Sequence, residues 1–348
     1  MFSQFKWCFI LSAVGIVLGG FAGAFISTAG MLGGFIVGLE RTAVLGVAEA
    51  SMSLDNSVVA SGILKSMSPV WQQRYITWGF PIAVIVMRFS LPILLVSAIT
   101  AQAPWTTFMM AIRHPAEYGA VLTSHEHQIT AFGGSFLLLI ALSYFMGDEK
   151  GEDHWIGFIE STMAKLGTMT TMPLVITLCV LVGTAIFAIP DMEFRSYMLS
   201  GVSGVIGYYL VKDGLSALMG TELTPKDMVG TGGFGTFCYL ECIDASFSFD
   251  GVIGAFAITN NIFQIAIGLG IGALFIRKLT LITVESGAID DLPYIENGAF
   301  MAILTLSAIM FFNLKIHVPD FVTGLVGAGF IGAALIASIR ENRKNATT

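Results

Sequence analysis

The chain has 348 residues, of which 55% are hydrophobic and only 12% are charged, and its formal net charge is −7. Soluble domains usually carry about 25% charged residues, so this composition excludes an ordinary water-soluble domain. The negative net charge also excludes nucleic acid as a partner, because a protein that binds nucleic acid needs a basic face.

Apolar stretches recur along the chain at lengths that suit a bilayer. A hydrocarbon core of about 30 Å needs roughly 20 apolar residues in helical conformation. The sequence therefore predicts an all-α, polytopic membrane protein with about ten transmembrane helices in the lipid bilayer. In chain order, the predicted spans cover 8–28, 42–64, 75–101, 128–146, 170–190, 196–219, 232–258, 261–278, 295–313 and 319–339.

The Lys and Arg residues indicate how these spans are oriented. With a cytoplasmic N-terminus, 12 of the 17 Lys and Arg residues fall in cytoplasmic segments, as the positive-inside rule requires. Both termini are therefore expected in the cytoplasm, with a bacterial inner membrane as the assigned location and an organelle membrane as the alternative. Small residues near Ala22 and Ala24 leave open a cleaved signal peptide in place of the first span. The loop at 148–168 is acidic and polar, and its acidic run at 148–154 is expected to be solvated. Arg277 and Lys278 are expected to be positive-inside anchors.

An acidic serine motif occurs twice inside predicted spans. Residues 49–56 read Glu-Ala-Ser-Met-Ser-Leu-Asp-Asn, and residues 244–251 read Asp-Ala-Ser-Phe-Ser-Phe-Asp-Gly. The first copy lies in the second span and the second copy in the seventh, and this odd shift makes the two copies cross the membrane in opposite directions. Many transporters are built on such an inverted-topology repeat. The predicted organisation is one membrane domain, 1–348, with a first repeat at 42–146, connecting spans at 147–231, a second repeat at 232–313 and a last span at 319–339.

Helical spacing sorts the polar side chains of the first copy. Glu49, Ser53 and Asn56 share one face of a helix, whereas Asp55 lies on another face. Convergence of these groups therefore requires unwinding near the motif, or a division of the carboxylates between a central site and its access path. The second copy repeats the pattern, and Glu241 adds a carboxylate one turn earlier. The predicted metal-binding residues are Glu49, Ser53, Asp55, Asn56, Glu241, Asp244, Ser248 and Asp250.

Carboxylates inside apolar spans point to a function. Each ionised acid costs about 3 kcal/mol at the centre of a membrane helix, so partners or a ligand must offset the charge, and Arg88 in the third span is the predicted counter-ion. Carboxylates and hydroxyls suit hard divalent cations such as Mg²⁺, Ca²⁺ and Mn²⁺, and neither copy contains His. Cys238 and Cys242 flank Glu241 and leave contact with a softer metal open. Close helix packing is the alternative role of the serines.

Shorter motifs accompany the acidic repeat. They are LDN at 54–56, QQR at 72–74, Arg88, GG at 133–134, FSFDG at 247–251, Thr259, Arg277 and ENGA at 296–299. Together these motifs resemble the TerC-like membrane proteins of the lysine-exporter superfamily. The resemblance implies a metal-ion transporter with manganese export as its role. This sequence departs from the pattern in an extra span before the first repeat and in the spans between the repeats. The positions that match the family's acidic residues are Glu49, Asp55, Asp244 and Asp250.

These observations lead to one favoured function and two alternatives. The favoured function is a secondary transporter that exports a hard divalent cation, first of all Mn²⁺, in exchange for protons at the same carboxylates. The cation is then a substrate, and no permanently bound cofactor and no enzymatic activity are expected. One alternative is an exporter of an amino acid or other organic solute, which would need Arg88 for the substrate carboxylate. The other is an intramembrane aspartyl enzyme in which Asp55 and Asp250 share a proton. The sequence has no GxxxxGK[ST] loop of an ATP-driven pump, and it leaves the oligomeric state open.

Overall fold

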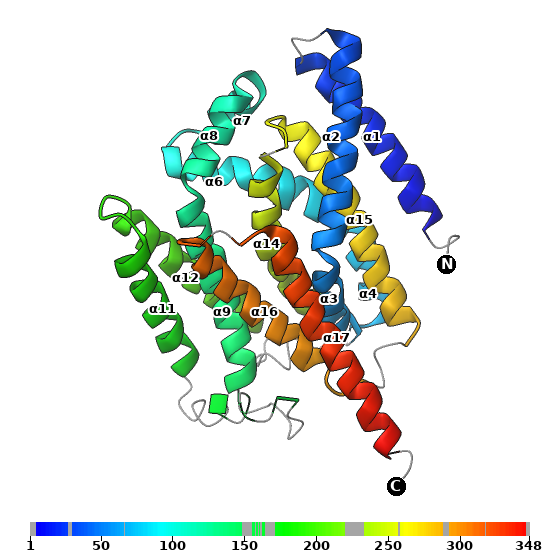
Figure 1. Cartoon of the computed structure of the whole chain (residues 1–348), viewed down its shortest axis with the longest axis vertical. Coiled ribbons are helices and arrows are strands. Elements are labelled where there is room, and N and C mark those ends of the chain that lie inside the picture. Colours follow the sequence, from blue (N-terminus) through cyan, green and yellow to red (C-terminus); the bar gives the residue numbers. More distant parts are fainter. Residues whose placement is uncertain are drawn as a thin grey trace. The chain divides into compact units, whose positions relative to one another are not determined.

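The described part of the chain is mainly helical. A computed structural model describes residues 5–26, 30–65, 67–147, 155–156, 158, 160, 162–163, 171–219, 233–256, 258–287, 292–316 and 318–345. Within these ranges every regular element is a helix (Figure 1), so the predicted all-α class is confirmed.

The first half of the chain forms longer helices that are followed by a series of short ones. The elements are α1 (Lys6–Ile26), α2 (Met31–Met52), α3 (Leu54–Lys65), α4 (Pro69–Thr77), α5 (Gly79–Pro81), the π-helix η1 (Ile82–Ser90), α6 (Leu91–Thr100), α7 (Pro104–Arg113) and α8 (Pro115–Ser124). The second half consists mainly of long helices. They are α9 (Glu126–Met146), α11 (Met172–Ala188), α12 (Phe194–Met219), α14 (Phe234–Phe256), α15 (Ile262–Glu285), α16 (Ile295–Asn313) and α17 (Asp320–Asn345).

Many of these helices are suited to cross a membrane. Among the described residues, seven stretches are long and apolar enough for this, and α11 is a shorter apolar helix. The chain is therefore a polytopic helical membrane protein, while the number of ten spans stays a prediction. The seven stretches are Lys6–Phe25, Met31–Ser51, Pro69–Ala98, Glu126–Met146, Ile262–Glu285, Ile295–Asn313 and Leu325–Arg343.

The helix bounds differ from the predicted spans most around the first motif copy. The ninth span, predicted at 295–313, coincides with α16. The second span, predicted at 42–64, is instead the later part of a helical stretch that begins with α2 and continues as α3 after an interruption at Ser53. Glu40 and Arg41 end the apolar pattern in the sequence, but both are compatible with helical conformation and lie inside α2.

The external loop predicted at 102–127 contains helices of its own. Both α7 and α8 begin with a proline at the first helical position, where the missing N–H costs no intrahelical hydrogen bond. Ala111 of α7 and Tyr118 and Leu122 of α8 are buried. The loop is therefore a structured connection between α6 and α9.

The helices group into two compact units, each built from separated parts of the chain. The chain passes from one unit to the other inside each motif copy, between residues 54 and 55 and between residues 246 and 247. Each copy therefore contributes residues to both units. The predicted repeat boundaries stay a prediction. Unit 1 comprises Met1–Leu54, Gln73–Glu126 and Phe247–Leu279, and unit 2 comprises Asp55–Gln72, His127–Ser246 and Thr280–Thr348.

In unit 1, α1 and α2 pack closely along glycine-containing faces. A Cβ atom at Gly38 would lie 2.6 Å from the Gly19 carbonyl oxygen, so the two backbones leave no space for a side chain there. Small residues of this kind allow membrane helices to approach each other closely. The buried Gln264 of α15 donates to the same Gly19 carbonyl at 3.3 Å and accepts from the Thr259 hydroxyl at 2.7 Å. Helix α1 is thus held to α15 by a hydrogen bond.

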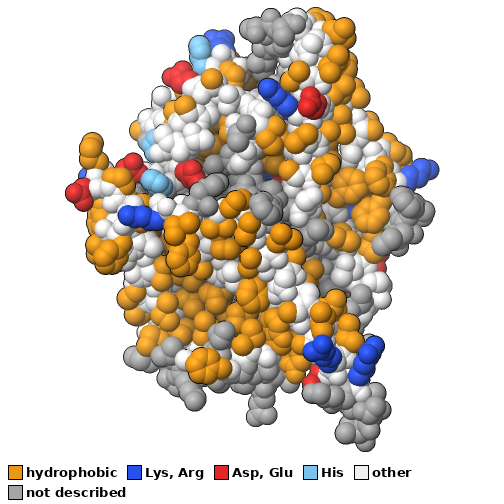
Figure 2. All heavy atoms as spheres, in the orientation of Figure 1, with side chains coloured by type: hydrophobic (Ala, Val, Ile, Leu, Met, Phe, Trp, Pro, Cys, Tyr) orange, Lys and Arg blue, Asp and Glu red, His pale blue; other side chains and the backbone are white. Residues whose placement is uncertain are grey.

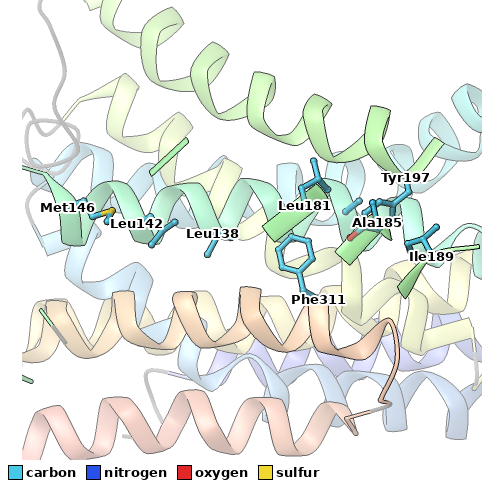
Figure 3. Packing of buried hydrophobic residues seen from close by; sticks show 9 residues of the cluster. Leu138, Leu142, Met146, Leu181, Ala185, Ile189, Tyr197 and Phe311 are labelled. Carbon is cyan, nitrogen blue, oxygen red and sulfur yellow. The ribbon is translucent and has the colours of Figure 1, made fainter. Parts of the chain in front are cut away.

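In unit 2, an apolar cluster joins α9, α11, α12 and α16. Leu138 and Leu142 lie one turn apart on α9, and Leu181 of α11 packs into the same cluster. Figure 3 shows Phe311 pointing from α16 toward α9. The buried Ser307 of α16 also donates to the Gly134 carbonyl of α9 at 2.9 Å. These contacts fix α9 and α16, which carry polar residues described below.

Large hydrophobic side chains are exposed on many helices. Figure 2 shows one face, on which hydrophobic side chains cover much of the described surface and charged side chains are sparse. On α1 the exposed residues include Trp7, Phe9 and Phe21. Soluble monomers rarely expose contiguous apolar patches larger than a few hundred Å². A surface of this kind is suited to lipid and agrees with the membrane assignment.

Candidate metal-binding site

Glu49, the first acid of the first motif copy, forms a buried ion pair with Arg88. Arg88 Nη2 donates to Glu49 Oε1 at 2.5 Å, and the two side chains are only 3% and 4% exposed. An isolated charge in the apolar interior of a membrane protein is costly. The pairing neutralises both groups, and it joins α2 to the π-helix η1 within unit 1.

Arg88 reaches Glu49 from an unusual helix. The buried residues of η1 are Ala83, Met87 and Arg88, and their spacing follows the wider turn of i→i+5 hydrogen bonding. Arg88 Nη1 also donates to the Ala83 carbonyl at 3.2 Å. Arg88 Nε has no hydrogen-bond partner among the described residues. The guanidinium is therefore anchored on its own helix and makes a contact with Glu49 through one nitrogen. Helices of this type are rare and occur frequently at functional sites.

The second motif copy lies against the same carboxylate. A Cβ atom at Gly251 would lie 2.9 Å from Glu49 Oε2, so the final residue of the second copy is adjacent to the first acid of the first copy. A Cβ atom at Gly272 of α15 would lie 2.8 Å from the Ala50 backbone nitrogen. Glu49 is therefore surrounded by η1 on the side of Oε1 and by glycine backbone of α14 and α15. This contact lies within unit 1.

Ser53 stands where the helix of the first copy is interrupted. Its backbone, with φ −94° and ψ 16°, ends α2, and its N–H still donates to the Glu49 carbonyl at 3.0 Å. Helix α3 begins at the next residue. The helix of the first copy is thus interrupted at one residue, whereas α14 runs through the second copy as a continuous helix. Convergence of the acidic groups stays a prediction.

Asn56, Glu241 and Asp244 lie in unit 2. Glu241 is buried, and Asp244, one turn further along α14, is partly exposed, as is Asn56 on α3. Beside Asn56, the hydroxyl groups of Ser57 and Thr280 are hydrogen-bonded at 3.0 Å. This buried bond joins α3 to the end of α15 and fixes the helix that carries Asn56.

Three of the predicted site residues have side chains outside the described part of the structure. They are Asp55 of α3 and Ser248 and Asp250 of α14, whose backbones are helical. Among the side chains that are described, no group of three or more His, Cys, Asp or Glu residues is close enough to hold a metal ion. Hydroxyl, carbonyl and water oxygens, besides carboxylates, are ligands of hard divalent cations. Glu49 and Ser53 carry oxygen ligands of this kind.

A family model described as "Protein of unknown function (DUF475)" matches residues 54–345, which is most of the chain. The chain belongs to the DUF475 family. No curated protein and no solved structure matches it. The DUF475 match begins at Leu54, the first residue of α3. It therefore contains Arg88 and the second motif copy, whereas Glu49 and Ser53 precede it.

Within the DUF475 match, Arg277 departs from its predicted role as an anchor in a positive-inside segment. Its side chain is 2% exposed. Arg277 Nη1 donates to the Tyr75 carbonyl at 2.9 Å, and its Cζ lies 4.4 Å from the centre of the Tyr75 ring, a cation–π geometry. The prediction fails because α15 continues to Glu285, seven residues beyond the predicted end of the eighth span at 278. The apolar residues after Lys278 are the signal that indicated this.

The DUF475 match also contains a buried carboxylate that the sequence analysis missed. Glu160, in the polar loop predicted at 148–168, is 0% exposed. The run at 148–154, which was expected to be solvated, lies outside the described residues. It accepts from the backbone N–H groups of Trp155 and Ile156 at 3.1 and 3.2 Å and from Asn297 Nδ2 at 3.3 Å. Tyr144 in turn donates to Asn297 Oδ1 at 2.8 Å. The apolar residues around Glu160, in the run Trp-Ile-Gly-Phe-Ile-Glu, are the sequence signal for burial.

Proposed function

We propose that this chain is a secondary transporter that carries a hard divalent cation across the membrane on the acidic groups of its two motif copies. Mn²⁺ is the first candidate, with export from the cytoplasm and exchange for protons at the same carboxylates. The proposal includes cytoplasmic termini and a bacterial inner membrane. The residues assigned to the cation are Glu49, Ser53, Asp55, Asn56, Glu241, Asp244, Ser248 and Asp250, with Arg88 as counter-ion.

The observation that carries this proposal is the surroundings of Glu49. The Glu49 carboxylate is 96% buried in a membrane helix and is neutralised by a buried arginine. Burial of an ionisable group in a membrane helix costs free energy, so such a group is by default interpreted as functional. The glycine backbone of the second copy lies next to its Oε2 atom. An acid from one copy and the end of the other copy are therefore close together, as a shared binding site requires.

The helix interruption at Ser53 adds support. Discontinuous helices in transporters expose backbone carbonyl groups at the end of a half-helix, and these carbonyls coordinate cations. The C-terminus of a helix also carries a partial negative charge that favours a cation nearby. Helix α2 ends at Met52, in the middle of the acidic motif. Carboxylate, hydroxyl and carbonyl oxygens together are the donor set that suits Mg²⁺, Ca²⁺ and Mn²⁺.

The resemblance to TerC-like proteins favours Mn²⁺ among these cations. The alternative of an organic-solute exporter needs Arg88 to bind the substrate carboxylate, but Arg88 is engaged by Glu49. The alternative of an aspartyl enzyme rests on Asp55 and Asp250 alone. Counterflow of labelled lysine without counterflow of Mn²⁺ would favour the organic-solute exporter.

Flux into proteoliposomes tests the proposal. The purified full chain is reconstituted, and uptake of Mn²⁺, Mg²⁺ and Ca²⁺ is followed with and without a pH gradient. We expect Mn²⁺ uptake that depends on the gradient, and we expect Asp55→Asn and Asp250→Asn to abolish it while both variants still insert into the membrane.

The matched control is Glu117→Gln on α8, an exposed acid that should transport as the wild type does. Mn²⁺ flux that survives both aspartate changes would show that the assignment of the site is wrong. Absence of flux for every divalent cation in the wild type would reject the transporter itself.

A further inference from the structure

The contact between Arg88 and Glu49 is less complete than an arginine–carboxylate pair can be. Strong pairs are bidentate, with two parallel N–H···O bonds. Here Nη2 contacts Oε1, Nη1 is directed to the Ala83 carbonyl, and Nε has no hydrogen-bond partner among the described residues. Arg88 would keep its bond to Ala83 if Glu49 took another partner.

The two oxygens of Glu49 face different surroundings. Oε1 lies on the side of η1 and accepts from Arg88, whereas Oε2 lies beside Gly251, where the chain has no side chain. Gly251 directly follows Asp250, the last acid of the second copy. A cation that comes from the side of the second copy would therefore reach Oε2 first, at the opposite oxygen from Arg88.

We propose that the Arg88 guanidinium takes the place of the transported cation in the empty site. It pairs with the Glu49 carboxylate when no cation is bound, and it releases this carboxylate when a divalent cation arrives. This inference rests on the proposed function, because it describes the empty state of the same site. It keeps Glu49 neutralised in both states, and the released guanidinium keeps its bond to the Ala83 carbonyl. The attraction between the divalent cation and its ligands must also offset the cost of leaving the buried Arg88 without its carboxylate.

The exchange also selects for cation charge. A monovalent cation offers Glu49 no more charge than the guanidinium already does, so displacement of Arg88 gains no Coulomb energy. A divalent cation offers twice the charge and gains attraction at the same distance. Arg88 therefore acts as the residue that excludes Na⁺ and K⁺ from Glu49.

Calorimetric titration of the detergent-purified full chain with Mn²⁺ tests this inference. Arg88→Gln removes the guanidinium, so we expect Mn²⁺ to bind at least about tenfold more tightly than to the wild type. Na⁺ should compete with Mn²⁺ in this variant and not in the wild type. Arg88→Lys keeps the charge but loses the planar group that bonds both Ala83 and Glu49, and its affinity should lie between the two. Arg113→Gln, an exposed arginine of α7, is the matched control and should bind as the wild type does.

The outcomes separate this inference from the proposed function. If the wild type binds Mn²⁺, Glu49→Gln loses binding and Arg88→Gln binds no more tightly than the wild type, the exchange is wrong and the transporter remains. If Arg88→Gln does not fold, Arg88→Lys decides, because unchanged or weaker binding in that variant also overturns the exchange. If no protein in the set binds a divalent cation, the proposed function itself fails.

Discussion

Glu49 and Glu160 are both buried carboxylates, but the chain holds them in different ways. Glu49 of unit 1 is neutralised by Arg88, a long side chain whose contact is made through a single nitrogen. Glu160 of unit 2 accepts hydrogen bonds from the backbone of residues 155 and 156 and from Asn297, which Tyr144 orients. The partner of Glu49 is a single side chain, whereas the partners of Glu160 are largely backbone.

The kind of hydrogen-bond partner can distinguish a carboxylate suited to bind a substrate from one that supports the fold. Backbone N–H donors fix a carboxylate in one position and leave little reason for exchange. A counter-ion that contacts one carboxylate oxygen through a single nitrogen, with Gly251 beside the other oxygen, leaves the carboxylate a second oxygen for exchange. On this argument Glu49 belongs to the proposed transport site, and Glu160 ties the segment after α9 to α16.

Removal of the Glu49 charge should have the largest effect. Glu49→Gln leaves Arg88 buried without its carboxylate, and such a change costs about 3–5 kcal/mol of stability. The double variant with Arg88→Gln removes both charges, so it should recover much of this loss. Thermal unfolding of both single variants and the double variant in detergent measures the coupling. Losses that simply add in the double variant would show that the two groups do not act as a pair.

Removal of the Glu160 charge should have a smaller effect of a different kind. Glu160→Gln places an amide N–H₂ opposite groups that are themselves donors, which costs about 1–3 kcal/mol. Mn²⁺ affinity, measured by calorimetry, should stay at the wild-type value. Glu126→Gln, an exposed acid at the start of α9, is the control for both measurements. A loss of Mn²⁺ binding in Glu160→Gln as large as that in Glu49→Gln would remove the distinction between the two carboxylates.

A methyl group beside Glu49 should have the smallest effect on stability. The Cβ of Gly251→Ala would lie 2.9 Å from Glu49 Oε2, and the carboxylate end can shift, so the cost should be about 1 kcal/mol. Mn²⁺ binding should weaken because the methyl group occupies the space next to Oε2. The control is Gly62→Ala on α3, where a Cβ meets nothing within 4 Å and helix propensity should add up to about 1 kcal/mol. Wild-type affinity in Gly251→Ala would contradict the approach of the cation at Oε2.

Apolar length predicted several of the long helices well, because a bilayer requires it of every span, but it did not predict the division of 42–64 between α2 and α3. The bounds of α16 were predicted to the residue, and those of α9 nearly so. Features that depend on distant partners were not predictable. Arg277 donates to the carbonyl of Tyr75, which lies 202 positions away in the sequence. Glu160 accepts from Asn297, which lies 137 positions away.

The candidate site was predictable only as a set of residue types. The repeated motif predicted which acids belong to the site, and the position of Arg88 in an apolar stretch predicted that it is a counter-ion. Arg88 pairs with Glu49, 39 positions away, and this pairing depends on the π-helical turn of η1. No hydrophobic pattern of a single sequence indicates that turn. The interruption at Ser53 has likewise no glycine or proline beside it in the sequence.

The π-helix η1 also allows the third span to change its helical bonding locally. Its i→i+5 bonds hold more residues in each turn than the α-helical bonds of α6 do. Conversion of one such turn before Arg88 to α-helical bonding would rotate Arg88 and α6 together, relative to the helices before η1, by about 100°, the angle between successive residues of an α-helix, while the backbone N–H groups keep acceptors. Deletion of a single residue within 82–87 would therefore change the direction of the guanidinium relative to the helices before η1 and leave the following helix intact.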